Sequence, residues 1–232
     1  MFISLQETVQ ATQEVLEVAP VEKTMSIIQL LKDSGLSGQI IIYIILGLLA
    51  MGLFIYFERL SAINAASKVD KNFMNQIRDY VSNGKLDAAK ILCAQNSTPA
   101  ARLVEKGISR IGKPLDDINK AIENAGSLEI YKLEKNVSVL ATIAGAAPML
   151  GFLGTVVGMI IAFHNMASSG GQAEMGVLAG GIYTAMTTTV AGLVVGIIAY
   201  IAYNHLVVKT NKVVHLMEAN SVEFLDLLNE PI

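Results

Sequence analysis

Threonine hydroxyls are the side chains of this chain with the clearest potential for chemistry in an otherwise apolar setting. Thr155 lies in one apolar run, and Thr184, Thr187, Thr188 and Thr189 fall within six positions of the next. A hydroxyl both donates and accepts a hydrogen bond, so several together can orient water or relay a proton, although they hold no charge at neutral pH. A helical threonine also commonly donates to its own i−4 carbonyl. The sequence leaves both roles open for these five residues.

The stretch around these threonines is almost free of charge. Between Lys135 and Lys209 there is no lysine, arginine or aspartate, and Glu174 is the only glutamate. The stretch divides into two apolar runs, 137–163 and 177–208, each longer than the roughly 20 residues that cross a bilayer as a helix. If protons pass here, the carboxylate that carries them is absent from these spans, and a partner must supply it.

Small residues recur every three to four positions along both runs. They form one ridge of Ala147, Gly151, Gly154, Gly158 and Ala162, and a second of Gly181, Ala185, Thr188, Gly192 and Gly196. Such ridges let helix backbones approach closely in lipid. They can pack within one chain, but two ridges and several threonines exceed the needs of one helix hairpin. We therefore expect a self-associating oligomer.

Pro148 lies inside the first of these runs. Proline removes a backbone hydrogen bond and bends a helix. The carbonyl that it frees can accept from a neighbouring hydroxyl or from water. A kink that is merely tolerated explains the residue equally well.

A third apolar run occupies 40–57 and spans about 27 Å as a helix. It ends at Glu58 and Arg59, which are adjacent and therefore not expected to face each other, so we interpret them as anchors at the membrane surface. The fold class is then an all-α integral membrane protein with three transmembrane helices, two of which extend into the cytoplasm. The predicted segments are an N-terminal segment (1–38), the first span (39–58), a helical domain (59–136), the second span (137–163), a hairpin (164–176), the third span (177–206) and a C-terminal helix (207–232).

Basic residues predict the orientation of the chain. Residues 58–136 hold 13 of the 17 Lys and Arg, and the hairpin 164–176 has none. The positive-inside rule places 58–136 and the C-terminus in the cytoplasm, with the N-terminus and the hairpin on the other side. The N-terminus lacks the features of a signal peptide. Apolar residues around 25–36 predict a short amphipathic helix, either in the membrane surface or packed on the protein.

The cytoplasmic segment has helical periodicity. We predict helices over 70–81, 86–94 and 99–111, the last opened by Thr98 as N-cap with Pro99 in the first turn. From Leu115 onward the pattern predicts one very long helix that becomes the second span. The third span likewise continues past the membrane to about residue 228, so a helical bundle projects below the bilayer.

Other functions find little support in the composition. A net charge of −3 gives no support for nucleic-acid binding. We expect the single cysteine, Cys93, to be a buried, inert thiol, and we expect His164 and Glu174 to be solvated loop residues rather than a metal site. We find no phosphate loop and no nucleophile–base pair, so we expect no enzyme activity and no cofactor. The three spans also lack the internal repeat typical of secondary transporters.

The two small-residue spans resemble the MotA/TolQ/ExbB proton-channel family. The resemblance rests on APMLGFLGTVVGMIIAF, on GIYTAMTTTVAGLVVGIIAYIAYN and on FERL after the first span, and it covers about residues 36–215. The three-span layout is more similar to the ExbB/TolQ branch than to the four-span MotA branch.

The resemblance implies a pentamer in the bacterial inner membrane around a pair of single-span helices of the ExbD/TolR type. An aspartate on that partner would take up and release protons, and the work would reach the outer membrane through a TonB- or TolA-like protein. Thr155 and Thr189 match the two family hydroxyls that face this aspartate. Thr184 stands where ExbB and TolQ commonly carry glutamate, which leaves the partner aspartate as the sole acid at that depth. The alternatives are a TolQ-like subunit for envelope integrity, a motor for another envelope process, or a passive membrane scaffold.

Overall fold

The structure is a computed structural model that describes residues 36–68, 72–168 and 175–229, and within these ranges the regular structure is helical, without a strand. Three helices are long and apolar enough to cross a membrane, which confirms the predicted fold class. Glu174 and the amphipathic segment expected near 25–36 lie almost wholly outside the described residues. The helices are α3 (Leu36–Ala66), α4 (Phe73–Ser82), α5 (Leu86–Gln95), α6 (Pro99–Ile108), α7 (Leu115–Glu134), α8 (Val137–Ser168) and α9 (Met175–Asn229).

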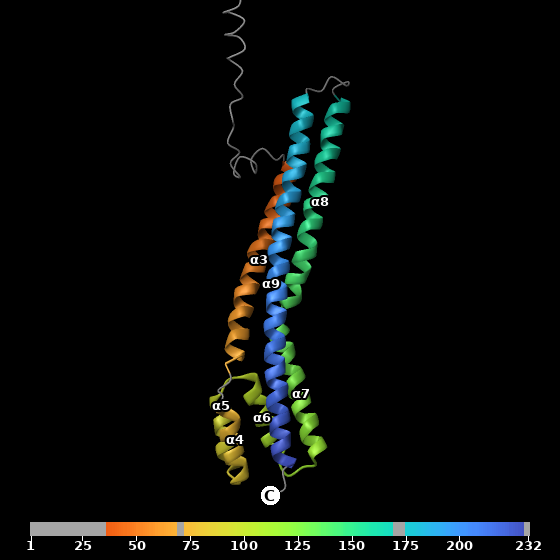
Figure 1. Ribbon diagram of the computed structural model, residues 1–232. Helices are drawn as coiled ribbons and strands as arrows, with labels where there is room; N and C mark the ends of the chain where they lie inside the picture. Colours follow the sequence, from red (N-terminus) through yellow and green to blue (C-terminus); the bar gives the residue numbers. More distant parts are fainter. Residues whose placement is uncertain (1–35, 69–71, 169–174, 230–232) are drawn as a thin grey trace, which may run out of the picture.

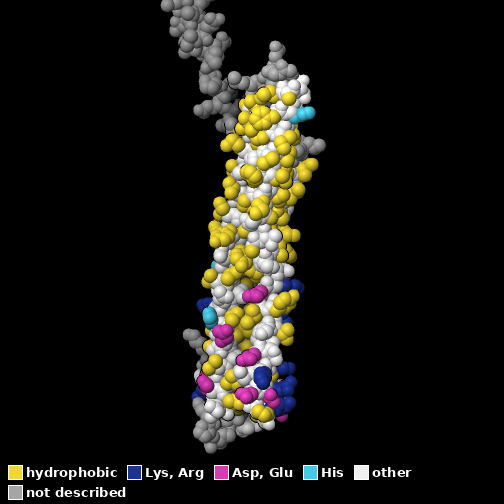
Figure 2. Space-filling model, turned by 90° about the vertical axis from the view of Figure 1, so that its right-hand side faces the viewer, with side chains coloured by type: hydrophobic (Ala, Val, Ile, Leu, Met, Phe, Trp, Pro, Cys, Tyr) yellow, Lys and Arg dark blue, Asp and Glu magenta, His cyan; other side chains and the backbone are white. Residues whose placement is uncertain are grey.

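The molecule is elongated, and α9 runs along nearly its whole length (Figure 1). Helices α3, α8 and α9 lie side by side in one half, and α4 to α7 surround the C-terminal part of α9 in the other. Apolar side chains cover the first half on the face drawn in Figure 2, whereas acidic and basic side chains gather over the second. These two parts are called the membrane half and the bundle half below.

Helix α3 extends beyond the predicted first span. Helix α3 continues past Glu58 and Arg59 to Ala66, so the charged pair marks a change of surroundings rather than the end of a helix. Arg59 forms an ion pair with Glu58, and its Nη1 donates to the backbone carbonyl of Lys132 at 3.3 Å. The expectation that the two neighbours do not meet is therefore wrong, because the long arginine side chain turns back across the helix. Arg59 ties α3 to α7 instead of serving only as an anchor.

A turn interrupts the predicted long helix between α7 and α8. Lys135 has φ −50° and ψ 128°, and Asn136 has a positive φ of 62°. Lys135 thus leaves the helical region, and asparagine is among the residues that tolerate a positive φ. The prediction of one continuous helix is wrong here, because no proline or glycine stands at the break to signal it.

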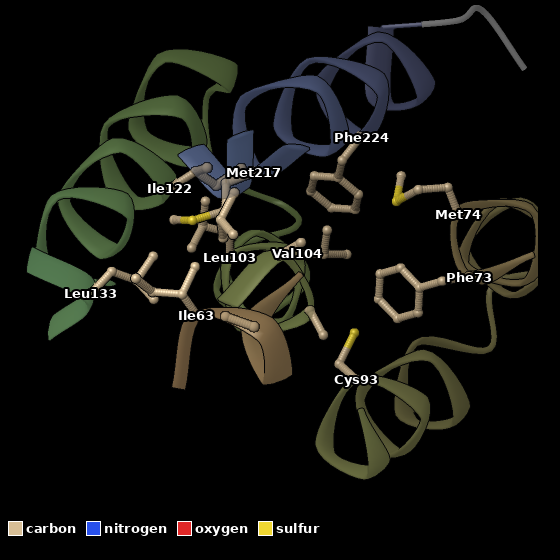
Figure 3. Packing of buried hydrophobic residues seen from close by; sticks show 14 of the residues in the cluster. Ile63, Phe73, Met74, Cys93, Leu103, Val104, Ile122, Leu133, Met217 and Phe224 are labelled. Atoms are coloured by element: carbon tan, nitrogen blue, oxygen red, sulfur yellow. The ribbon is translucent and has the colours of Figure 1, made fainter. Parts of the chain in front are cut away.

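The bundle half contains a conventional hydrophobic core (Figure 3). Phe73 of α4, Val104 of α6 and Phe224 of α9 point into it, and each is at most 2% exposed. Helix α6 begins as predicted, since Thr98 Oγ1 accepts from the backbone N–H of Ala101 at 3.4 Å. It ends at Ile108, three residues before the predicted end.

Candidate functional site

Helices α8 and α9 approach each other closely at Gly151 of α8. A Cβ atom on this residue would stand 2.8 Å from the carbonyl oxygen of Thr188 and 3.0 Å from Cα of Thr189, both on α9. Because these neighbours are backbone atoms that cannot move aside, only glycine fits without shifting a helix. The α8–α9 contact is thus backbone against backbone at this depth.

The two small-residue ridges pack on each other along this contact. A Cβ on Gly158 would lie 3.0 Å from Cβ of Ala185, and one on Gly181 would lie 2.6 Å from Cβ of Ala162. Gly154 faces the side chain of Thr188, and Gly192 faces Gly151. The ridges therefore meet within one chain, which is the intramolecular packing that the sequence left open. The expectation of a self-associating oligomer stays a prediction.

Pro148 fits against a glycine of the opposite helix. A Cβ on Gly196 would stand 2.6 Å from Cγ of the proline ring and 3.1 Å from the carbonyl oxygen of Ala144. Ala144 is the i−4 residue whose carbonyl loses its helical partner at a proline. This carbonyl thus faces the backbone of α9 at Gly196. The helix continues through Pro148 to Ser168.

Thr188 lies inside the helix contact. It is fully buried, and its Oγ1 is 2.7 Å from the carbonyl oxygen of Ala185 and 3.3 Å from that of Gly151. A hydroxyl enclosed in this way holds α8 and α9 together and has no surface to offer to a channel. We therefore correct the prediction that Thr188 lines a proton pathway.

Thr155 and Thr189 converge on the same point of α8. Thr189 Oγ1 donates across the contact to the carbonyl oxygen of Gly151 at 3.1 Å. In the helix this carbonyl is also the i−4 acceptor for the backbone N–H of Thr155. The Thr155 hydroxyl itself donates to the carbonyl of Phe152 at 2.7 Å. Both threonines are half-buried, so they border the tight contact and remain accessible from one side.

Of the other threonines of the region, Thr187 and Thr142 make local hydrogen bonds. Thr184, one turn before Thr188, is half-buried. Thr187 donates to the Tyr183 carbonyl at 3.0 Å, and Thr142 donates to the Ser138 carbonyl at 3.2 Å. Both of these are local i−4 bonds that need no functional explanation.

The chemistry available at Thr155 and Thr189 is that of an acceptor. Each hydroxyl spends its proton on a backbone carbonyl, so its lone pairs remain for a donor from outside, such as a protonated carboxylic acid. The described parts of the two spans contain no Asp, Glu, Lys or Arg. Throughout the described residues, no group of three or more His, Cys, Asp or Glu side chains is placed to hold a metal ion. Thr155 and Thr189 can therefore accept a hydrogen bond from a group that carries a proton, but they cannot carry the proton themselves.

Three polar contacts in the bundle half and at its boundary escaped the sequence prediction. Tyr56 Oη and His205 Nδ1 are 2.8 Å apart, and Lys209 Nζ donates to Asn64 Oδ1 at the same distance. Both link α3 to α9, yet the residues are about 145 positions apart in the chain, and His205 looked isolated. The only available signal was that α3 and α9 leave their apolar runs at these positions.

The third missed contact is centred on Glu129 of α7. This carboxylate is 7% exposed and pairs with Arg102 of α6 and, at 2.7 Å, with Lys132. Burial alone would raise the pKa of Glu129, but the hydrogen bonds from Arg102 and Lys132 outweigh it and hold the pKa below its usual range. The ion pair thus fixes α6 against α7 in the bundle.

The structure confirms the prediction that Cys93 is a buried thiol. Its thiol is buried, and burial, aided by the charge of Glu105, raises its pKa to about 12. The reactive thiolate is therefore scarce at neutral pH.

These features define a class of multi-pass membrane proteins in which an acid-free, threonine-bearing helix pair stands on a charged helical bundle. The family profile of one such class matches residues 95–219, which is more than half of the chain. The chain belongs to the MotA/TolQ/ExbB proton channel family. This confirms the predicted resemblance, and the family is one of proton channels rather than enzymes. Together with the three apolar helices, it supports a multi-pass protein of the bacterial inner membrane.

Curated relatives carry ExbB and TolQ names. An ExbB homolog of Methanothermobacter thermautotrophicus is 28% identical over 175 residues, covering 73% of this chain and 60% of that protein. TolQ of Haemophilus influenzae is 41% identical over 95 residues, or 40% of this chain and 41% of its own. ExbB of Helicobacter pylori is 37% identical over 92 residues, or 40% of this chain and 62% of its own. The chain thus spans less than two thirds of the length of each of these three relatives.

Proposed function

We propose that this chain is the ring-forming subunit of a proton-driven motor in the bacterial inner membrane. Five copies would surround a pair of ExbD/TolR-like helices, with the N-terminus and the hairpin 164–176 in the periplasm and the bundle half in the cytoplasm. The observation that carries the proposal is the pair of acceptor hydroxyls, Thr155 and Thr189, at the edge of an acid-free helix contact. Family membership supports it independently.

Because the described parts of the two spans contain no Asp or Glu, the proposal places the proton-carrying carboxylate on the partner. A protonated aspartate on the partner helix is neutral and donates to the lone pairs of Thr155 or Thr189. Once deprotonated, the same aspartate is costly to keep against an apolar wall and must turn toward water. One charge crossing a 100 mV potential releases about 2.3 kcal/mol, which is more than a hydrogen bond between neutral groups contributes, about 0.5–1.5 kcal/mol. Proton uptake and release can thus bias rotation of the ring around its core.

Apolar side chains beside these threonines supply the surface for assembly. Phe152, Met186 and Val190 are each at least 60% exposed in the single chain. In the pentamer, this surface would contact neighbouring copies, the partner helices or lipid.

The work would energise TonB-dependent outer-membrane transport, as the ExbB names of several relatives suggest. A TolQ-like role in envelope integrity is the second candidate, because TolQ of H. influenzae is 41% identical over 95 residues. The periplasmic domain of the partner distinguishes the two, since it must fit either a TonB-like or a TolA-like protein.

Substitution of the two acceptor hydroxyls tests the proposal. We expect the double variant Thr155→Val, Thr189→Val to abolish proton-dependent uptake when the partner is co-expressed. Thr142→Val is the matched control, because Thr142 is exposed and its hydroxyl bonds only the local Ser138 carbonyl. Full uptake by the double variant would contradict the proposal.

The mass of the purified assembly tests the ring separately. We expect five copies, alone and with the partner. A monomer or dimer would contradict the motor, and a pentamer that passes no protons with its partner would indicate a passive scaffold.

A further inference from the structure

A groove of about 380 Å³ lies between α7 and α9 in the bundle half. Apolar side chains from three helices line it, namely Leu103, Ile122, Ile130, Met217 and Leu225. Helix α6 forms the floor, because a Cβ atom on Gly126 of α7 would lie 3.6 Å from Leu103 Cδ2 of α6. Val222 of α9 also lines the groove and is 57% exposed. The groove thus presents apolar surface that the described part of the chain leaves open.

Two carboxylates border this groove from opposite sides, Glu123 on α7 and Glu218 on α9. Glu123 Oε1 accepts from Asn119 Nδ2 at 2.9 Å, and Glu218 Oε2 is 3.3 Å from His215 Nδ1. Neither carboxylate pairs with a lysine or arginine of the described chain, and no described residue of the lining is a lysine or arginine. The groove is therefore complementary to an apolar surface that carries positive charge.

Another face of α7 has that composition. Exposed residues recur there every three to four positions and form one strip, called the Leu128 strip below: Lys120, Asn124, Leu128, Tyr131 and Lys135. Leu128 and Tyr131 are 64% and 74% exposed, and neither lysine is in an ion pair with another described residue. No residue of the strip lines the groove. The strip and the groove are thus separate surfaces on one helix, both apolar at the centre and opposite in charge.

We propose that the Leu128 strip of one copy docks into the α7–α9 groove of the neighbouring copy. The contact joins two different surfaces, so it is head-to-tail and can repeat around a closed ring. Both surfaces lie at the same level of α7, since Leu128 falls between Ser127 and Ile130 of the groove lining. Copies placed side by side around an axis along the molecule bring equal levels together. The inference rests on the proposed ring and specifies the surfaces that join it in the bundle half.

The charges give this contact its orientation. Lys120 stands three residues from Glu123, or about 4.5 Å along the helix, so the lysine of one copy is level with the carboxylate of the next. An exposed pair of this kind contributes little free energy. Burial of Leu128 and Tyr131 supplies the larger favourable part. The pairing of Lys120 with Glu123 instead favours the docking of strip against groove over that of strip against strip.

Disulfide cross-linking of the full-length chain in isolated membranes tests the contact. Two pairs sample the length of the groove, Leu128→Cys with Val214→Cys and Asn124→Cys with Val222→Cys. On oxidation with copper phenanthroline we expect at least one pair to give a ladder of bands up to five chains, since a disulfide forms where Cα atoms lie within about 7 Å. Cys93 is buried, so the wild-type chain should stay monomeric.

Two controls define what the ladder means. Leu128→Cys alone should give no dimer, and a strong dimer band would overturn the proposal in favour of contact between two strips. Ile91→Cys with Val214→Cys should give no ladder, because Ile91 is 59% exposed on α5 and belongs to neither surface. A ladder from this control pair as strong as those of the test pairs would also overturn the proposal.

Native mass spectrometry separates failure of this contact from failure of the ring. Five copies without a ladder from either test pair would overturn the docking and leave the ring intact. Absence of five copies would overturn the ring, and the docking with it.

A charge exchange tests the orientation. Lys120→Glu should lower the cross-linked fraction at least about fivefold, because attraction to Glu123 becomes repulsion. Addition of Glu123→Lys to the same chain should restore the fraction. Lys85→Glu, at an exposed position before α5, is the matched control and should have no effect. An unchanged fraction in Lys120→Glu would overturn the docking in this orientation.

Discussion

Helix α9 passes through two environments and is held differently in each. In the membrane half, Gly192 and Gly196 bring its backbone against α8. In the bundle half, Met217 and Phe224 insert large side chains into a core formed with α6 and α7 (Figure 3). In the membrane half, glycine lets the backbones of α8 and α9 pack closely. In the bundle half, large buried side chains hold the same helix in place.

The difference follows from the solvent. Lipid gives apolar helices no hydrophobic reason to associate, so close van der Waals packing and hydrogen bonds such as Thr189 to Gly151 must hold them together. Water drives apolar side chains together in the bundle. The same division separates the charges. Acids such as Glu129 are paired in the bundle, whereas the described spans contain no Asp, Glu, Lys or Arg.

The largest effect is expected from a change in the bundle core. Phe224→Ala removes a fully buried ring and should lower the free energy of unfolding by about 3–5 kcal/mol. Hydrogen exchange in lipid nanodiscs should rise in α6, α7 and the C-terminal part of α9, while the membrane half stays protected. Val222→Ala is the control, because Val222 is 57% exposed on the same helix. Equal losses in the two variants would contradict the assigned core.

A methyl group at the helix contact should have the next largest effect. Gly151→Ala places its Cβ against the backbone of Thr188 and should cost about 1–3 kcal/mol. Exchange should then rise in α8 and the first half of α9, the reverse of the Phe224 pattern. Gly145→Ala, with no neighbour within 4 Å, should be neutral or stabilising by up to about 1 kcal/mol. If both alanines behaved alike, the close contact would be wrong.

The buried ion pair should make the bundle sensitive to acid. Because the pKa of Glu129 is lowered in the folded state, its contribution is present above the ordinary value of 4.5 and disappears as pH falls through the folded pKa. Glu129→Gln should cost about 1–2 kcal/mol at pH 7, since both cationic partners are partly exposed and screened. Thermal unfolding between pH 7 and pH 3 should show the difference between wild type and variant shrinking with acidity. A constant difference would argue against the pair.

The smallest effect is expected at Thr188. Thr188→Val keeps the shape and loses one buried hydroxyl, so we expect a cost of about 0.5–1.5 kcal/mol, detected as faster exchange in α8 and α9. Proton flux with the partner should be unchanged, because Thr188 is enclosed. Loss of proton flux with normal hydrogen exchange would show that Thr188 lines the proton pathway and would contradict its enclosed position.

Much of the architecture could be predicted from sequence because its signals are local. Uncharged apolar runs mark the spans, and Thr98 with Pro99 marks the start of α6. The turn at Lys135 and Asn136 could not be predicted, since it uses residues that also occur within helices. The Tyr56–His205 contact and the ion pairs of Glu129 depend on tertiary packing, which leaves no pattern in a single sequence.

The candidate site was predicted only in part for a related reason. Spacing identified Thr155 and Thr189 as hydroxyls of interest, but it also included Thr188, since three consecutive threonines look alike in sequence. Only the rotation of α9 against α8 separates the enclosed hydroxyl from the accessible ones. The same rotation turned both small-residue ridges toward each other, which the sequence could not distinguish from contact with a second copy.

Proton flux into liposomes tests the central claim most directly, namely that the spans of α8 and α9 do not carry the proton and that an aspartate of the partner does. The purified chain alone should pass no protons under an imposed potential, and the chain with its partner should pass them. Replacement of the partner's membrane aspartate by asparagine should abolish that flux. Flux through this chain alone, or flux that survives the asparagine replacement, would contradict the account.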